Sequence, residues 1–162
     1  MKRYIFFLTV ILICLNAEAQ RVIEKPKYGF STAPYVKIVR IELDSSATVF
    51  HFDVMFGSGN WIVIPSRTYI RPAETYRKLY IKEAEGITID KKFYMPDSGR
   101  VSYKLYFPPL DESVEVIDYG EDGGTWFIFQ IELAAKKWIA LLSVSPLLND
   151  QTPRRNKYHR KV

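Results

Sequence analysis

Apolar and polar residues alternate in short runs along this chain, and this alternation constrains the fold more than any other feature. Successive side chains on a β-strand point to opposite faces, so a period of two is typical of a strand with one buried face. In one such run the apolar face is predicted to carry Phe50, Phe52, Val54 and Phe56, and the other face Val49, His51, Asp53 and Met55. Two further runs predict buried faces that carry Val101, Tyr103, Leu105 and Phe107, and Phe127, Phe129, Ile131 and Leu133.

Turn-forming residues separate these runs. Glycine, proline, aspartate and asparagine gather at residues 57–60, 96–99 and 121–124. The runs recur about every ten residues, which is typical of an all-β sandwich. We therefore expect residues 20–149 to form an antiparallel immunoglobulin-like β-sandwich. The cysteine pair that links the sheets of antibody domains is absent, so the expectation concerns the architecture alone.

One predicted strand, residues 35–43, changes its apolar phase in the middle. The apolar positions move from Val36 and Ile38 to Val39, Ile41 and Leu43. An extra residue in one strand of a pair produces such a shift, so we expect a β-bulge there. The alternation as a whole predicts one shared core, which contains Phe50, Phe52, Val54, Leu105, Phe107, Phe129 and Ile131.

The first nineteen residues have the pattern of a secretory signal peptide. Lys2 and Arg3 precede an apolar run at residues 4–15, and the small residues of Ala17-Glu18-Ala19 follow. Such a run is shorter than the roughly 20 residues that span a bilayer. We expect cleavage before Gln20, no lipidation of Cys14 and no stable membrane span in the mature protein. The expected location is periplasmic or extracellular.

The C-terminal part departs from strand periodicity. Within residues 134–148, Ala134, Trp138, Leu141 and Ser145 fall at helical spacing and Pro146 lies near the end. This pattern favours a short helix that docks on the sandwich, with a continuing strand as the alternative. Residues 150–162 are predicted to be a basic, disordered tail.

The net charge of +5 belongs to the two ends of the chain. The signal peptide contributes +1 and residues 150–162 contribute +4, so residues 20–149 are neutral in sum. A nucleic-acid-binding domain would carry its basic residues on the folded surface, so no nucleic-acid partner is expected. The single cysteine, Cys14, lies in the signal peptide, which excludes thiol chemistry and thiolate metal sites from the mature chain.

Few residues have the spacing of a catalytic or metal site. His51 and Asp53 share one strand face and would form an acid–base pair in a hydrolase with Ser66 or Ser102 as nucleophile. A solvated polar face is the favoured interpretation, because no third ligand or nucleophile recurs at a useful spacing. The acidic pairs at residues 111–112 and 121–122 are interpreted as turns, with a calcium site at the second pair as the alternative. We expect no catalytic residues, metal or cofactor.

Two tryptophans are the candidate ligand-binding residues. Trp61 and Trp126 lie in predicted strands, and exposed aromatic side chains mark binding surfaces. A place in the core is the alternative for each, since large aromatic residues are commonly buried in a sandwich.

Several segments resemble a module of secreted Bacteroidetes proteins that precedes a thioredoxin-like (redoxin) domain. They occupy residues 41–43, 47–49, 59–64, 68–70, 84–87, 95–99, 107–110, 117–119 and 126–133 and include Met95-Pro96-Asp97-Ser98-Gly99 and Phe107-Pro108-Pro109-Leu110. The resemblance implies a β-sandwich with no catalytic residues of its own. The redox cysteines of the longer relatives belong to the following domain, and these 162 residues contain no Cys-x-x-Cys.

These observations lead to three ranked expectations. The first is a non-catalytic secreted or periplasmic accessory module that binds or scaffolds an envelope or periplasmic protein, with an exposed sheet edge available for strand addition. The second is a carbohydrate-binding module of an envelope glycan system, which requires Trp61 or Trp126 to be exposed beside polar side chains. The third is the hydrolase built on His51 and Asp53.

Overall fold

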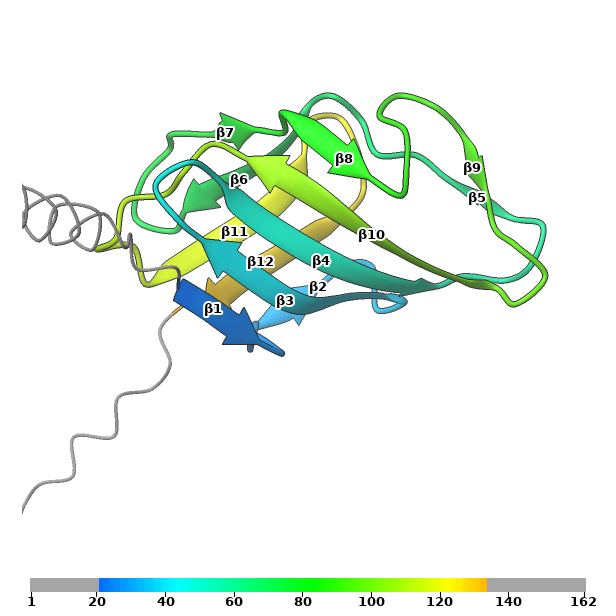
Figure 1. The fold of residues 1–162 in the computed structure, drawn as a ribbon, viewed down its shortest axis with the longest axis horizontal. Helices are drawn as coiled ribbons and strands as arrows, with labels where there is room; N and C mark the ends of the chain where they lie inside the picture. The colour runs from blue at the N-terminus through cyan, green and yellow to red at the C-terminus, as the bar shows by residue number, and fades with distance from the viewer. Residues whose placement is uncertain (1–20, 134–162) are drawn as a thin grey trace, which may run out of the picture.

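The computed structural model describes residues 21–133, which form two open antiparallel sheets that pack face to face (Figure 1). The first sheet has the order β1 (Arg21–Glu24), β3 (Val36–Leu43), β4 (Thr48–Met55), β10 (Arg100–Phe107) and β8 (Glu83–Glu85). The second has the order β2 (Phe30–Ser31), β12 (Phe127–Glu132), β11 (Val116–Glu121), β6 (Thr68–Pro72) and β7 (Leu79–Tyr80). A separate two-stranded ribbon pairs β5 (Trp61–Ile62) with β9 (Phe93–Tyr94).

The predicted antiparallel β-sandwich is confirmed. No helix occurs between residues 21 and 133. The signal peptide, the segment at residues 134–148 and the basic tail lie outside the described residues, so these expectations remain predictions.

The N-terminal segment links the two sheets. β1 pairs with β3 at one edge of the first sheet. The chain then crosses to the second sheet, where the Lys27 carbonyl accepts a hydrogen bond from the Glu132 amide (2.8 Å) and the Gly29 amide donates to the Phe129 carbonyl (3.0 Å). The next residues pair with β12 as β2. One continuous segment therefore closes the same side of both sheets.

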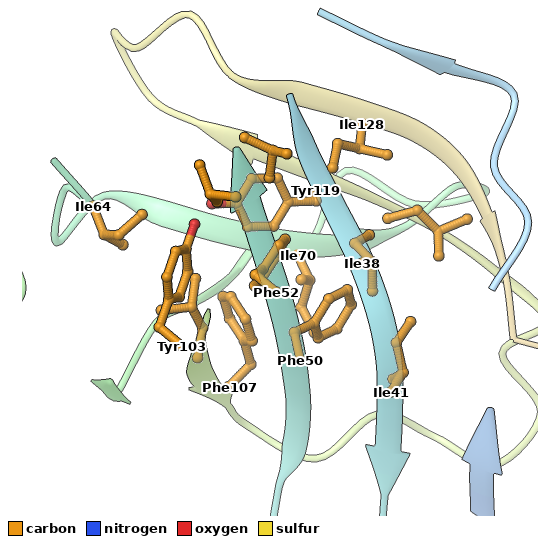
Figure 2. Close-up of a cluster of buried hydrophobic side chains, with 14 of the residues drawn as sticks. Ile38, Ile41, Phe50, Phe52, Ile64, Ile70, Tyr103, Phe107, Tyr119 and Ile128 are labelled. Carbon is orange, nitrogen blue, oxygen red and sulfur yellow. The ribbon is translucent and has the colours of Figure 1, made fainter. Parts of the chain in front are cut away.

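The core lies between the sheets and is rich in aromatic rings (Figure 2). Phe52 stacks on Tyr103 with 5.3 Å between ring centroids and also contacts Tyr119 at 5.4 Å, which joins the two sheets. Six of the seven predicted core residues are buried, namely Phe50, Phe52, Val54, Leu105, Phe107 and Ile131. The alternation in β4 and β10 thus predicted the buried faces correctly, because each strand has one face in the core.

The predicted bulge in β3 is also confirmed. Ile38 lies opposite Phe52 and Arg40 opposite His51, so Val39 is the extra residue. The bulge lets Ile38 and Ile41 both face the core, which a regular strand would not allow because side chains three positions apart point to opposite faces.

A second bulge, in β12, makes the seventh prediction wrong. Tyr119 pairs with Ile128 and Ile117 pairs with Ile131, so Phe129 and Gln130 together oppose a single residue of β11. Ile128 is therefore buried before the bulge and Ile131 after it. Phe129 lies on the outer face of the second sheet, together with Phe127, and is only half-buried.

Candidate functional site

The outer face of the first sheet carries a row of polar side chains that crosses all five strands. The strand registers place Glu24, Arg40, His51, Lys104 and Glu85 directly opposite one another, in that order. Residues opposite each other on one face of a sheet have neighbouring side chains. His51 therefore lies between two cationic positions and the row ends in a carboxylate at each edge of the sheet.

His51 approaches a carboxylate in the next row. Its Nε2 lies 3.0 Å from Oε1 of Glu42, and Nε of Arg40 lies 2.9 Å from the same oxygen. Both contacts are at ion-pair distance but lack the alignment of a hydrogen bond. The His51 side chain is 21% exposed as a whole, although its Nε2 atom is buried against Glu42, so the imidazole belongs to a charge cluster at the sheet surface.

Asp53 and Ser102 are opposite partners on β4 and β10, on the same face as His51. The Ser102 hydroxyl donates a hydrogen bond to Oδ1 of Asp53 at 2.5 Å. His51, Asp53 and Ser102 line one shallow depression of about 180 Å³ that opens to solvent. A serine nucleophile must pass its proton to a base such as histidine, and here the serine proton points to the aspartate.

The second serine considered from the sequence lies elsewhere. Ser66 precedes β6, and its backbone amide donates to Oδ1 of Asp90 at 2.8 Å in a loop contact. This hydrogen bond holds the pKa of the Asp90 carboxyl below its usual value. The structure therefore brings His51, Asp53 and Ser102 together but does not add Ser66 to them.

The edge of this polar face is held by charge-assisted hydrogen bonds. The Lys104 ammonium donates to Glu85 at 3.0 Å, and the Tyr106 hydroxyl donates to the same carboxylate at 2.9 Å. These bonds hold the pKa of Glu85 below its usual value and raise the pKa of Lys104. The arrangement pairs charged groups with each other on an open sheet surface.

The ribbon of β5 and β9 presents exposed aromatic side chains. Trp61 and Tyr94 are opposite partners and are 47% and 64% exposed. Their neighbours Ile62 and Phe93 face the other way, Ile62 buried in the core and Phe93 packed against it. The Lys92 ammonium lies 4.1 Å from the centroid of the Trp61 ring. Figure 1 places this ribbon at the opposite end of the sandwich from the first and last described residues.

Trp126, the second tryptophan candidate, lies at the rim of the core. It is half-buried and meets the Tyr35 ring edge-on at 5.7 Å and 77°. Tyr35 in turn stacks on Phe56 at 4.8 Å. This packing covers much of the indole, so Trp61 is the more accessible of the two candidates.

A buried polar cluster lies near Trp126 at the same end of the core. Glu121 is 5% exposed, and burial raises its pKa to about 7 although the backbone amides of Trp126 and Thr125 hydrogen-bond to its carboxylate. The hydroxyl groups of Tyr103 and Tyr119 point into the same region of the core (Figure 2). Neither tyrosine hydroxyl has a hydrogen-bond partner of good geometry among the described residues, and burial raises both pKa values.

The two predicted acidic turns have different outcomes, because Asp111 and Asp122 make turn or ion-pair contacts whereas Glu121 is the buried last residue of β11. Asp111 accepts hydrogen bonds from the amide and hydroxyl of Ser113. Asp122 contacts the Lys78 ammonium and accepts a hydrogen bond from the Tyr80 hydroxyl at 2.8 Å. Within residues 21–133, no three histidine, aspartate or glutamate side chains converge as metal ligands.

Sequence reasoning missed Tyr94, Lys92 and the buried carboxyl of Glu121. Tyr94 pairs with Trp61, which lies 33 positions earlier in the chain. A pairing between strands so far apart cannot be predicted from the local sequence pattern. Glu121 lies in a sequence that reads as a turn, whereas the register with Thr68 turns its side chain inward.

Comparison with known proteins returns no family model, no curated protein and no solved structure that matches this chain. Residues 21–133 contain no helical segment that could span a bilayer.

Proposed function

We propose that the domain is a non-catalytic accessory module, secreted or periplasmic, that binds or scaffolds an envelope protein. The single observation that carries this proposal is the exposed pair Trp61 and Tyr94 on the projecting β5–β9 ribbon. Tryptophan and tyrosine dominate the energetic centres of protein interfaces, since they bury a large area at a small cost in conformational entropy.

The backbone beneath this pair favours a preformed contact surface. The Met95 amide donates to the Asn60 carbonyl at 2.8 Å, and the Gly59 amide donates to the Met95 carbonyl at 3.3 Å. Ile62 anchors the ribbon in the core from the other side. A surface that is already ordered loses little entropy on binding.

The polar face of the first sheet supports the same proposal. Its serine is hydrogen-bonded to Asp53 rather than to His51, and its depression is open to solvent. The resemblance to the module that precedes redoxin domains agrees with an accessory role. The signal-peptide pattern at residues 1–19 gives the proposed location.

The exposure of Trp61 also favours a second candidate, a carbohydrate-binding module. Trp61 is 47% exposed and has the polar Lys92 side chain over its ring, which meets the requirement stated above for a carbohydrate-binding module, an exposed tryptophan beside polar side chains. Both candidates use the same ribbon, so they differ in the ligand and not in the site.

Co-purification from the native envelope tests the proposal. The mature protein is compared with the double variant Trp61→Ala/Tyr94→Ala and with Tyr76→Ala, a control in which a 94% exposed tyrosine outside the ribbon is removed. We expect a protein that is retained by the parent and the control and is lost with the double variant. Retention of a soluble envelope polysaccharide with the same pattern would favour the glycan candidate. Equal retention by all three proteins would contradict both candidates.

A further inference from the structure

The outer face of the second sheet carries a strip of aromatic rings, called here the outer aromatic row. It consists of Phe30 on β2, Phe127 and Phe129 on β12, Tyr69 on β6 and Tyr80 on β7. Phe129 lies nearly parallel to both neighbouring phenyl rings, at 6.4 Å from Phe30 and 5.9 Å from Phe127. Tyr69 and Tyr80 are opposite partners whose rings meet at 6.1 Å.

Gly120 joins the two halves of the row. It lies between Phe127 and Tyr69 in the register of the sheet. A β-carbon at this position would lie 2.7 Å from the Tyr69 hydroxyl oxygen and 2.9 Å from Cδ1 of Phe127, so these rings close over the glycine backbone. The row is therefore continuous over five strands, a width of about 19 Å at the usual strand spacing.

Part of this row is open to solvent. Phe30 is 60% exposed and Tyr80 44% exposed, and Phe127 and Phe129 are half-buried. Tyr69 is buried, with the Lys78 ammonium over its ring, so the open part of the row lies around Phe30 and Phe129. No other segment of residues 21–133 covers Phe30. An exposed apolar strip of this kind marks a contact surface, because burying it removes apolar area from water.

The chain that continues beyond Leu133 is the nearest candidate to cover it. The Leu133 amide donates to the Glu115 carbonyl at 2.7 Å, so the described chain ends on the second sheet, four residues after Phe129. Residues 138–148 then contain seven large apolar side chains, Trp138, Ile139, Leu141, Leu142, Val144, Leu147 and Leu148. As a helix, the eight residues that precede Pro146 would be about 12 Å long, which is more than half the width of the row.

The four intervening residues are sufficient for the chain to turn back. Residues 134–137 read Ala-Ala-Lys-Lys and reach at most about 14 Å when extended. A tethered segment also has an effective concentration in the millimolar range, which favours it over a separate molecule for the same surface.

We propose that the apolar segment at residues 138–148 folds back and packs on the outer aromatic row, with Phe30 and Phe129 beneath it. This contact gives the outward-turned rings of β12 a function that the core does not supply. It also identifies the face on which the C-terminal segment docks.

Tryptophan fluorescence of the full mature chain tests this proposal. The substitutions Trp61→Phe and Trp126→Phe leave Trp138 as the only reporter. We expect blue-shifted emission from Trp138 and several-fold protection from acrylamide quenching. Phe30→Asp should abolish this protection, because it places a charge in the row, whereas Tyr94→Asp, at an exposed aromatic on the distant ribbon, should not. The proposal would be overturned if Trp138 in the parent emitted like a free indole. It would also be overturned if Phe30→Asp and Tyr94→Asp changed the acrylamide quenching of Trp138 equally.

Disulfide trapping provides a second readout that does not depend on removing tryptophans. The chain after residue 19 contains no cysteine, so Phe30→Cys with Leu141→Cys introduces one defined pair. A disulfide requires the two Cα atoms to approach within about 7 Å. We expect an intramolecular bond under mild oxidation, with Tyr94→Cys/Leu141→Cys as the unlinked control. Links only between molecules, lost on dilution, would show that a second copy covers the row and would overturn the proposal.

Discussion

The backbone amide of Gln130 donates a hydrogen bond to the side-chain carboxylate of Asp118, with 3.0 Å between nitrogen and oxygen. Gln130 has a φ of +57°, a left-handed conformation that costs a non-glycine residue free energy. The same carboxylate accepts two hydrogen bonds from the Arg71 guanidinium, at 3.0 and 3.2 Å. Asp118 thus stabilises the bulge that turns Phe129 outward and lets Ile131 enter the core.

Removal of this carboxylate should destabilise the fold. Asp118→Ala leaves the Gln130 amide without its acceptor and the partly buried Arg71 without its counter-ion. We expect a loss of about 2–4 kcal/mol in the free energy of unfolding, measured by urea titration. Asp97→Ala, at an exposed turn position, is the matched control and should leave the midpoint unchanged. A midpoint for Asp118→Ala equal to that of the control would show that the bulge needs no such support.

The register of β12 predicts a smaller loss of stability for Phe129, on the outer face, than for Phe52 in the core. Phe52 is 1% exposed and packs against rings from both sheets, so Phe52→Ala should cost about 3–5 kcal/mol. Phe129→Ala removes a ring that the sheet itself only half-buries, so it should cost clearly less, about 1–2 kcal/mol even with residues 138–148 packed on the outer face. Chemical denaturation of both variants checks this difference. Similar losses for both would place Phe129 in the core and contradict the register of β12.

The bulges in β3 and β12 show which features the sequence could predict and which it could not. In β3 the polar residues Lys37 and Arg40 flank the change of phase, so the bulge at Val39 was visible. In β12 residues 126–129 are all apolar, and no alternation reveals which of Ile128 and Phe129 faces inward. The exposure of Trp61 could not be predicted from the sequence either, because it depends on pairing with a strand far along the chain.

The buried carboxyl of Glu121 predicts a pH-dependent stability. Its pKa rises from 4.5 to about 7 on folding, so the folded state binds the proton more tightly than the unfolded state. The stabilisation is complete below pH 4.5 and is lost as pH rises through about 7. The full change is roughly 3 kcal/mol.

Glu121→Gln separates this effect from the other titrations of the chain. Glutamine stays neutral, so the variant should gain stability relative to the parent as pH increases from 5 to 8. Urea unfolding of both proteins across this range measures the gain. Parallel stability curves for the two proteins would mean that the Glu121 carboxyl titrates in the same way in the folded and unfolded states.

The proposed binding site is the aromatic ribbon and not the polar face, and one binding measurement compares these two surfaces directly. The affinity of residues 20–162 for a protein that co-purifies with them is measured by calorimetry for the parent, for Trp61→Ala/Tyr94→Ala and for His51→Ala/Ser102→Ala. We expect at least a tenfold loss of affinity for the ribbon variant, about 1.4 kcal/mol or more, and parental affinity for the polar-face variant. Parental affinity for the ribbon variant together with a loss for the polar-face variant would contradict the proposed site.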